Sequence, residues 1–307
     1  MNEIVLETNG LTKYYDKTLA LDHLNLRVWR GCIYGFLGRN GAGKTTAIKL
    51  MLGLLKPTAG SAKLLGCDRG ELTPKIRKRI GYVTEGHRLY RWMRIGRLEK
   101  FQRAFFGGDW DDKLFGDMLE YFELSKKQKI KSLSNGQRAQ VSLALALAPN
   151  PELLVMDDPT LGLDTAIRRQ FLEVMIHLIQ GQGRTILFSS HILSDVERVA
   201  ERIAVIDKGV LRADCRLEEF QAKVRKVQFK FAESVPGEID LPGLLHKRQN
   251  EDEVELILVG TSDEEIEEWA EKSGACEHKY IKMNLEDQFI EYTEPANGKK
   301  LFQWEIE

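Results

Sequence analysis

The chain has 307 residues, of which 43% are hydrophobic and 30% are charged, and its formal net charge is −1. This composition is typical of a globular protein and excludes a disordered or fibrous chain. The net charge gives no overall field that would favour nucleic acid, and no apolar run approaches the roughly 18 residues that a membrane-spanning helix requires.

The first two thirds of the chain alternate between strand-like and helix-like patterns. Cys32–Leu37, Leu153–Met156 and Thr185–Phe188 are short apolar runs bounded by turn or polar residues, which is the pattern of buried parallel strands. Ile203–Leu211 indicates two strands around an Asp-Lys-Gly turn. Strand signals fade between about residues 86 and 150, where helical patterns dominate. We therefore predict an α/β core with a helical subdomain at about 86–150.

The charge balance changes near residue 220. Residues 1–215 carry 33 Lys and Arg against 24 Asp and Glu, whereas residues 216–307 carry 12 against 22. Alternating apolar residues in the acidic segment predict three strands, around 227–231, 254–258 and 281–285. The capping-box spacing of Ser262 and Glu265 predicts a helix before the third strand, and a final helix follows. We expect two domains, 1–220 and 221–307, the second a small α+β domain in the order β-β-α-β-α.

A glycine-rich loop follows the first apolar run. The sequence GRNGAGKT, which begins at Gly38, fits the phosphate-loop pattern GxxxxGK[ST]. Gly38, Gly41 and Gly43 let the backbone turn its N–H groups toward phosphate oxygens, and the following helix directs the positive end of its dipole at the same anion. Lys44 supplies a cation for the β- and γ-phosphates, and Thr45 offers a hydroxyl to Mg²⁺.

Two carboxylates follow the apolar run Leu153–Met156. A buried strand delivers Asp157 and Asp158 to its carboxyl end, where open α/β sheets bind ligands. An acidic turn after a strand is a weak signal alone. With a phosphate loop upstream, we interpret Asp157 as the carboxylate partner of Mg²⁺.

A third motif lies between these two. Leu133–Gln137 reads LSNGQ and precedes a helix-like stretch, Arg138–Ala148. The ordered set resembles the nucleotide-binding subunits of ABC transporters, whose signature is LSGGQ and whose fold is a P-loop ATPase core with a helical subdomain. The resemblance covers about residues 4–222 and implies binding of ATP and Mg²⁺ and hydrolysis of ATP by a nucleotide-binding domain at 1–220.

The resemblance also implies roles for single residues. Tyr15 matches the aromatic residue that stacks on adenine, Glu85 lies where the family has its Q-loop glutamine, and His191 matches the switch histidine. Asp157 matches the Walker B aspartate, and Asp158 takes the place of the general-base glutamate. The implied nucleotide-binding residues are Tyr15, Gly38, Asn40, Gly41, Gly43, Lys44, Thr45, Thr46, Ser134, Gly136 and Gln137. The implied catalytic residues are Asp158, His191 and Glu85, the implied Mg²⁺ ligands are Thr45, Glu85 and Asp157, and Leu161–Asp164 matches the D-loop.

Three positions depart from the family pattern. Asp158 is shorter than glutamate by one methylene, roughly 1.5 Å of reach, and a misplacement of about 1 Å can cost on the order of 100-fold in rate. We therefore predict slow but nonzero hydrolysis. Glu85 in place of glutamine is interpreted as a tolerated variant. Asn135 replaces the first signature glycine, and asparagine tolerates left-handed turn geometry better than most residues. Because Ser134 and Gly136 are intact, we expect ATP to be sandwiched between two copies as in the family.

The resemblance implies partners as well. In this family two copies pack head to tail, so that each ATP lies between one phosphate loop and the signature of the other copy, and a homodimer is favoured. The chain offers no spanning segment, which implies separate transmembrane subunits and a peripheral location on the cytoplasmic face of the membrane. The C-terminal segment and the segment after Glu85 resemble ATPases paired with ABC-2-type permeases, mostly exporters.

The predicted contact with the permease follows Glu85. Arginines recur every three residues there, with apolar residues between them: Arg88, Arg91, Arg94 and Arg97 alternate with Leu89, Trp92, Met93 and Ile95. We expect this stretch to dock on a cytoplasmic coupling helix of the permease. A solvated basic helix face is the alternative interpretation.

Two other functions remain open from the sequence. A soluble ABC ATPase acting on ribosomes or DNA is disfavoured, because such members carry two nucleotide domains or long coiled-coil insertions, and we expect no nucleic-acid partner. A nucleotide-gated regulatory protein with weak hydrolysis is kept open by Asp158. The transported substrate would be determined by the permease.

Overall fold

The computed structural model describes residues 3–232 and 234–293. The chain divides into two compact units, Met1–Leu211 and Arg212–Glu307, which are described separately below. The predicted fold class is confirmed, because the first unit is an α/β core with a helical region and the second combines a sheet with helices. Within the described residues, no helix is both long and apolar enough to cross a membrane.

A largely parallel sheet forms the centre of the first unit. Its strand order is β11-β10-β4-β9-β8-β7, and the pairs from β10 to β7 are parallel. The strands are β4 (Ile33–Leu37), β7 (Ile80–Val83), β8 (Leu153–Met156), β9 (Thr185–Ser190), β10 (Arg202–Asp207) and β11 (Val210–Arg216). Every residue of β4, β8 and β9 is buried, as the apolar runs predict. The strand pair β10–β11 turns through Lys208 and Gly209, both at positive φ.

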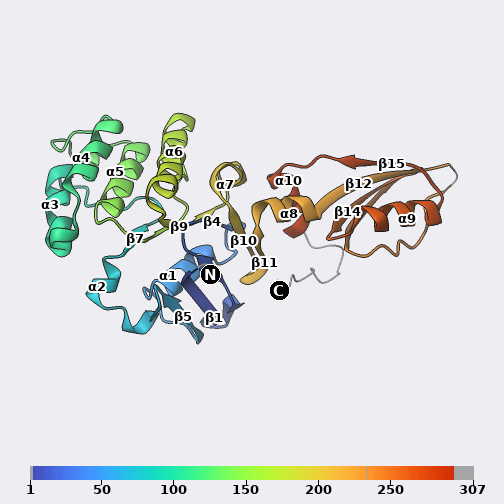
Figure 1. Ribbon diagram of the computed structural model, residues 1–307, viewed down its shortest axis with the longest axis horizontal. Helices are drawn as coiled ribbons and strands as arrows, with labels where there is room; N and C mark the ends of the chain where they lie inside the picture. Colours follow the sequence, from blue (N-terminus) through green and yellow to red (C-terminus); the bar gives the residue numbers. More distant parts are fainter. Residues whose placement is uncertain (1–2, 233, 294–307) are drawn as a thin grey trace. The chain divides into compact units, whose positions relative to one another are not determined.

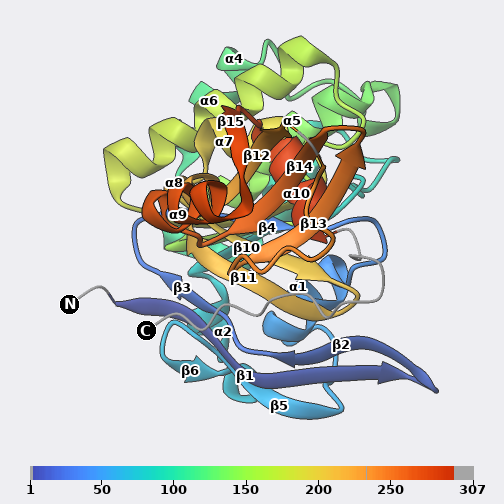
Figure 2. The same ribbon diagram turned by 90° about the vertical axis from the view of Figure 1, so that its right-hand side faces the viewer.

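An antiparallel sheet packs against the other side of the first helix. It contains β1 (Ile4–Tyr15), β2 (Thr18–Leu24), β3 (Arg27–Trp29), β5 (Ala59–Leu64) and β6 (Cys67–Asp68), with β1 paired to β2, β3 and β5. Helix α1 (Lys44–Met51) buries Leu50 and Met51 in a core shared with Leu6 of this sheet and Val155 of the parallel sheet. Figures 1 and 2 show α1 between β1 and β5 on one side and the parallel sheet on the other.

Helices dominate the chain between β7 and β8, as predicted. In the described residues from 84 to 152 there is no strand, only an isolated bridge between Arg94 and Lys129. The helices of the unit are α2 (Pro74–Arg77), α3 (Ile95–Phe106), α4 (Asp112–Tyr121), α5 (Asn135–Leu147), α6 (Thr165–Gln182) and α7 (Leu193–Val199), with 3-10 turns η1 (Arg69–Glu71), η2 (Gly107–Asp109) and η3 (Ile130–Ser132). Figure 1 shows α3, α4 and α5 gathered beyond the β7 edge of the parallel sheet.

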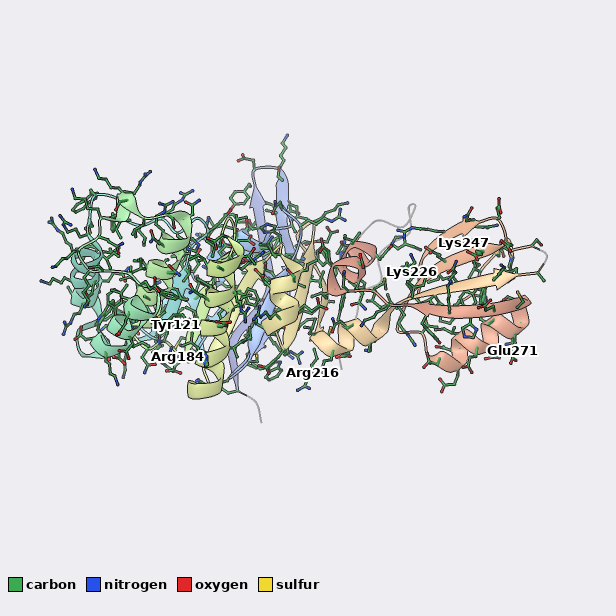
Figure 3. All side chains as sticks on the ribbon, turned by 90° about the horizontal axis from the view of Figure 1, so that it is seen from above. Tyr121, Arg184, Arg216, Lys226, Lys247 and Glu271 are labelled. Atoms are coloured by element: carbon green, nitrogen blue, oxygen red, sulfur yellow. The ribbon has the colours of Figure 1, made fainter. Side chains whose placement is uncertain are left out.

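The second unit is an antiparallel sheet with the order β13-β14-β12-β15. Its elements are α8 (Leu217–Lys223), β12 (Val224–Phe231), β13 (Leu244–Asn250), β14 (Glu253–Val259), α9 (Asp263–Ser273), β15 (Ala275–Ile281) and α10 (Leu285–Thr293). Helix α9 begins with the predicted capping box and buries Ile266 against Phe229 and Val254. Figure 3 labels Glu271, which lies on α9, and Lys226, which lies on β12.

Three details of the second unit differ from the sequence prediction. Helix α8 was not predicted. Strand β13 was not predicted either, because it has the polar sequence LLHKRQN and no buried residue. Strand β15 begins earlier than expected and ends at Ile281, so Met283 lies outside it and Leu285 begins α10. The apolar alternation of 281–285 therefore spans a strand end and a helix start.

Helix α7 packs so closely on β4 that only glycine fits at position 35. A Cβ on Gly35 would lie 2.6 Å from Val196 Cγ1 and 3.4 Å from Ala200 Cβ, both on or beside α7. We expect Gly35→Ala to lower the free energy of unfolding by about 1–3 kcal/mol through overpacking. Urea unfolding monitored by tryptophan fluorescence would measure the change.

The matched control is Gly116→Ala on α4, where an added Cβ meets nothing within 4 Å. Because alanine is the better helix former, this variant should be unchanged or stabilised by about 0.5–1 kcal/mol. Equal stability changes for the two variants would contradict the close approach of α7 to β4.

Candidate functional site

The glycine-rich loop joins β4 to α1 at the carboxyl edge of the parallel sheet. Gly41 and Gly43 have φ of 82° and 108°, a backbone region that favours glycine, and Gly43 is the N-cap of α1. A Cβ on Gly38 would lie 2.7 Å from the carbonyl oxygen of Ile206. Lys44 is 5% exposed, and its Nζ donates to the Gly38 carbonyl oxygen at 2.8 Å. The loop thus presents the positive end of a helix and a buried ammonium group to one space, as an anion site requires.

Two other segments support the loop through backbone contacts alone. A Cβ on Gly43 would lie 2.7 Å from the carbonyl oxygen of Ala20 in β2. The N–H of Gly209 donates to the carbonyl of Ala42 at 2.9 Å, and the N–H of Asp22 donates to the carbonyl of Gly209 at 2.8 Å. The phosphate loop, strand β2 and the β10–β11 turn are therefore packed without intervening side chains.

Asp157 is the most buried carboxylate of the site, at 1% exposure. Its Oδ1 accepts hydrogen bonds from Ser189 Oγ at 2.8 Å and from Thr45 Oγ1 at 3.1 Å. Among the described residues, no group of three or more His, Cys, Asp or Glu side chains forms a closed metal cage. One carboxylate beside one hydroxyl fits Mg²⁺, which takes most of its ligands from water and substrate phosphates. Thr45 and Asp157 are the residues that would hold it.

Asp158 follows directly and points toward the phosphate loop. Its Oδ1 accepts from His191 Nδ1 at 2.9 Å, and its Oδ2 lies 3.7 Å from Lys44 Nζ. The backbone N–H of Asp158 donates to Ser189 Oγ at 2.9 Å. Its φ is 42°, in the left-handed region where aspartate is enriched among residues other than glycine. The carboxylate is thus fixed between a cation and an imidazole at the site's edge.

The contact with Asp158 determines how His191 is protonated when the imidazole is neutral. A carboxylate oxygen only accepts, so Nδ1 carries the hydrogen and Nε2 keeps its lone pair. The backbone N–H of His191 donates to the same Asp158 oxygen at 3.2 Å. His191 follows β9 and is half-buried, with 29% of its side chain exposed. Two predicted catalytic residues are therefore in direct contact.

The remaining predicted residues of this edge are exposed or half-buried. Tyr15 ends β1 with 46% of its surface exposed, and Lys13 Nζ lies 5.2 Å from its ring centroid. Asn40 is exposed in the loop, and Thr46 is half-buried on α1. Glu85 follows β7, the neighbour of β8, and is exposed without a hydrogen bond or ion pair to any described residue. The structure therefore places Glu85 at the same sheet edge as Asp157 but not in contact with it.

The signature lies at the start of α5. Ser134 is the N-cap, and Ser134 and Gln137 form a complete capping box. Gly136 is buried beside α6, where an added Cβ would lie 3.0 Å from Ile167 Cγ2. Within the described residues, no hydrogen bond joins Ser134, Gly136 or Gln137 to the phosphate loop of the same chain. The structure therefore does not bring the signature together with the other predicted nucleotide-binding residues.

Asn135 does not need to tolerate left-handed turn geometry in this structure. Asn135 is the first residue of α5 and is absent from the positive-φ residues of the described chain. Its side-chain oxygen instead accepts a hydrogen bond from Arg138 Nη2, while Arg138 Nη1 donates to the Leu133 carbonyl at 2.6 Å. Asn135 is accommodated by these two hydrogen bonds of Arg138 and not by a special backbone conformation.

Sequence reasoning missed three side chains that hold the segment Asp158–Thr160. Ser189 contacts both aspartates, as described above. Thr160 Oγ1 donates to Asp195 Oδ2 at 2.7 Å, and burial raises the pKa of the Asp195 carboxyl. His87 Nε2 donates to the Pro159 carbonyl at 3.0 Å. Only Ser189 had a sequence signal, a hydroxyl residue at the end of an apolar strand beside the predicted switch histidine.

The predicted permease contact needs a correction. Met93 and Ile95 are buried, at 6% and 0% exposure, because backbone hydrogen bonds hold them against residues 128–130. The exposed apolar surface here is formed by four aromatic side chains, which we call the aromatic surface: Tyr90, Trp92, Phe101 and Phe105, at 53, 64, 43 and 64% exposure. Their rings lie in a chain of neighbours with centroids 5.3–6.3 Å apart. The four predicted arginines are exposed, and Arg97 lies over the Trp92 ring.

Comparison with known proteins identifies a family. A family model described as ABC transporter matches residues 21–161, a range that includes the phosphate loop, the signature and Asp158. The chain is 34% identical over 224 residues to the bacitracin transport ATP-binding protein BcrA of Bacillus licheniformis, covering 72% of this chain and 73% of the relative. It is 32% identical over 228 residues to the daunorubicin/doxorubicin resistance ATP-binding protein DrrA of Streptomyces peucetius, covering 71% and 67%.

One solved structure similar to this chain is a dimer in a post-hydrolysis state, the ATP-binding cassette MJ0796 bound to ADP and Pi. The TM-score is 0.63, with 25% identity, and the match covers 69% of this chain and 98% of that chain.

His87 gives the site a pH-dependent stability. Its side chain is buried, its Nδ1 has no hydrogen-bond partner among the described residues, and burial lowers its pKa. An unfolded histidine takes up a proton as pH falls through about 6.5, which the folded His87 resists. Stability attributable to His87 is therefore complete above pH 6.5 and is lost below it, by at most about 1.4 kcal/mol per pH unit.

We expect urea unfolding at pH 7.5, 6.5 and 5.5 to show a shallower fall in stability for His87→Gln than for the wild type. Glutamine retains a side-chain N–H for the Pro159 carbonyl but does not titrate. His177→Gln, at an exposed position on α6, is the control and should follow the wild type. Parallel wild-type and His87→Gln curves would contradict the assignment.

Proposed function

Because the chain belongs to the ABC transporter family as an ATP-binding subunit with ATPase activity, we propose that it drives export through separate transmembrane subunits of the ABC-2 type. The observation that carries the proposal is the convergence of Lys44, Asp158 and His191 at one sheet edge, beside the phosphate loop. Relatives named for bacitracin transport and for daunorubicin/doxorubicin resistance support an export role. They do not favour the alternative of a regulatory protein with weak hydrolysis.

The proposed reaction is attack of water on the γ-phosphorus of ATP, which breaks the bond between that phosphorus and the bridging oxygen and releases ADP and phosphate. Asp158 accepts a proton from the water, and His191 holds the Asp158 carboxylate through its Nδ1–H. Lys44 and the loop N–H groups bind the phosphates, and Tyr15 stacks on the base. When bound at Thr45 and Asp157, Mg²⁺ would neutralise charge that develops on the phosphate oxygens. Glu85 is proposed to act from the same edge, after movement toward the nucleotide.

Lys44 links nucleotide binding to the ability of Asp158 to accept a hydrogen bond from water. The Lys44 ammonium lies 3.7 Å from Asp158 Oδ2, and both side chains are nearly buried. Phosphate oxygens would compete with Asp158 for this cation, since charge-assisted hydrogen bonds to phosphate are strong. Binding of ATP would then leave Asp158 with His191 as its main partner and with a free oxygen for water.

The active form is proposed to be a head-to-tail dimer. Ser134 and Asn135 of the signature are exposed, and Ser134, Gly136 and Gln137 have no hydrogen bond to that chain's own phosphate loop among the described residues. A second copy related by two-fold symmetry would supply the missing signature to each nucleotide. The dimeric, post-hydrolysis structure similar to this chain supports that arrangement.

The aromatic surface and its arginines are the proposed contact with the permease, on the cytoplasmic face of the membrane. Exposed aromatic side chains beside arginines are typical of binding hot spots. Arg97 lies 5.2 Å from the Trp92 ring centroid, which holds the indole in an exposed position. We assign nucleotide binding to residues 1–220 and an accessory role to 221–307.

Substitutions of Asp158 test the reaction. We expect Asp158→Asn to lower Mg-ATP hydrolysis by roughly 100-fold or more, since it removes the general base, while ATP binding persists. Asp158→Glu should raise turnover, because the longer side chain restores the family's reach. Steady-state phosphate release by the purified protein would measure both, with Asp117→Asn at an exposed position of α4 as the control.

Turnover that Asp158→Glu fails to raise would count against reach as the limiting factor. A wild-type rate equal to that of Asp158→Asn would favour a nucleotide-binding switch that needs its permease to hydrolyse ATP.

The permease contact is tested by Trp92→Ala combined with Arg91→Glu. Removing a central aromatic anchor and reversing a neighbouring charge should cost at least about 2 kcal/mol of binding energy and abolish co-purification with the transmembrane subunits. ATP binding by the isolated chain should not change. Leu54→Ala, which truncates a 57% exposed apolar side chain elsewhere, is the control, and intact assembly of the double variant would refute the contact.

A further inference from the structure

Strand β15 forms one edge of the sheet in the second unit. It pairs with β12 alone, and within the described residues no backbone hydrogen bond joins its outer side to another segment. Figure 1 shows β15 beside β12 at the border of that sheet. The strand is seven residues long and contains no proline. About half of its N–H and C=O groups therefore face outward, where another strand could pair with them.

Two opposite charges stand symmetrically on this strand. Glu277 and Lys279 flank His278, both are exposed, and neither has a hydrogen bond or an ion pair with any described residue. The His278 ring lies on the side of α9, with its centroid 5.8 Å from that of Phe229 in the apolar layer. Because successive side chains of a strand alternate between faces, Glu277 and Lys279 share the opposite face.

A second copy of the same strand complements this pattern. When two copies of β15 pair antiparallel about a two-fold axis at His278, Glu277 of each copy lies directly opposite Lys279 of the other. Directly opposite residues share a face, so both copies of α9 then cover the same face of the joined sheet. A slip of one residue would put the two α9 helices on opposite faces. A slip of two residues would put like charges directly opposite each other.

The other edge strand, β13, does not offer such a match. Lys247 and Arg248 are adjacent and exposed, so two antiparallel copies of β13 centred there would oppose cations to cations. Charged side chains of one sign, lysine above all, are a usual means of keeping an edge strand unpaired. Arg248 is also held by Glu291 of α10 at 2.6 Å, and His246 Nε2 donates to the Glu291 carbonyl at 2.7 Å.

We propose that two copies of this chain associate through β15, which joins their two sheets into one continuous sheet. The contact consists of backbone hydrogen bonds and of two ion pairs between Glu277 and Lys279. It goes beyond the head-to-tail arrangement proposed above, because it involves neither the signature nor the phosphate loop and requires no nucleotide.

The charge pattern is tested by analytical ultracentrifugation without nucleotide, so that the proposed signature contact does not contribute. Glu277→Lys opposes lysines to lysines across the axis, and Lys279→Glu opposes glutamates to glutamates. Each variant should raise the dimer dissociation constant about 30-fold, which corresponds to about 2 kcal/mol over two pairs. Glu271→Lys, the same charge reversal at an exposed position of α9 (Figure 3), is the matched control and should dimerise like the wild type.

Mixing the two variants separates association from an effect on folding. A mixed pair contains two opposite-charge contacts, so we expect it to dimerise about as well as the wild type. Each single variant also changes the charges within its own sheet, where Glu277 lies opposite Lys230. Mixing leaves those changes within each chain in place, so recovery would be due to contact between copies. Thermal unfolding of each variant alone measures the change within the chain.

The register is tested by disulfide formation under mild oxidation, in a chain that carries Cys276→Ser. Directly opposite residues have Cα atoms about 4.5–5.5 Å apart, which a disulfide can bridge. His278→Cys should therefore cross-link two copies without nucleotide. Lys247→Cys, at an exposed position of β13 (Figure 3), is the control and should not cross-link.

Three results would overturn the proposal. They are a wild-type chain that stays monomeric without nucleotide, a mixture of the two charge variants that does not recover dimerisation, and a His278→Cys chain that cross-links no better than Lys247→Cys. Each would leave the proposed function intact, because dimerisation that depends on ATP and hydrolysis of ATP would be unaffected. Loss of ATP-dependent dimerisation alone would instead contradict the head-to-tail arrangement and leave the β15 contact standing.

Discussion

The approach of the Lys44 ammonium to the Asp158 carboxylate, at 3.7 Å, is the contact on which the site depends. Both side chains are nearly buried, and a buried charge without a partner is strongly unfavourable. Each group therefore needs the other when no anion is present. Since Lys44 follows β4 and Asp158 follows β8, with β9 between them, the register of three parallel strands fixes this distance. The phosphates of ATP would replace Asp158 as the partner of Lys44. Binding of ATP and release of Asp158, the proposed general base, would then be parts of one exchange.

The segment Asp158–Thr160 is held by a different element at each residue. His191 after β9 holds Asp158, His87 after β7 holds Pro159, and Asp195 on α7 holds Thr160. Displacement of any of these elements would move the same three residues. The segment after β7 contains the proposed permease contact, and His87 lies only five residues before Trp92. Movement at that contact would therefore have a physical route through His87 to Asp158, the proposed general base.

Elements with a local sequence pattern could be predicted, whereas features that depend on tertiary contacts could not. Strands β4, β8 and β9 are buried on both faces, so their apolar runs located them and the motifs that follow them. Strand β1 was not predicted, because register shifts near Lys13 interrupt its alternation. Strand β13 is recognisable only through its pairing with β14. The hydrogen bond from Arg138 to Asn135 and the hydrogen bond from His87 to the Pro159 carbonyl depend on the folded structure, and the local sequence gives no signal for them.

The backbone packing of Gly43 against Ala20 joins the phosphate loop to the strand that continues into the Tyr15 hairpin. Since both are parts of one copy, we expect the spacing between the phosphate loop and Tyr15, which is proposed to stack on the adenine, to be the same with and without a second copy. A contact that is equally good in two conformations raises affinity in both and shifts neither population. If Tyr15 stacks on the adenine as proposed, it would affect how long a nucleotide stays bound, and the choice between open and closed dimers would depend on the γ-phosphate.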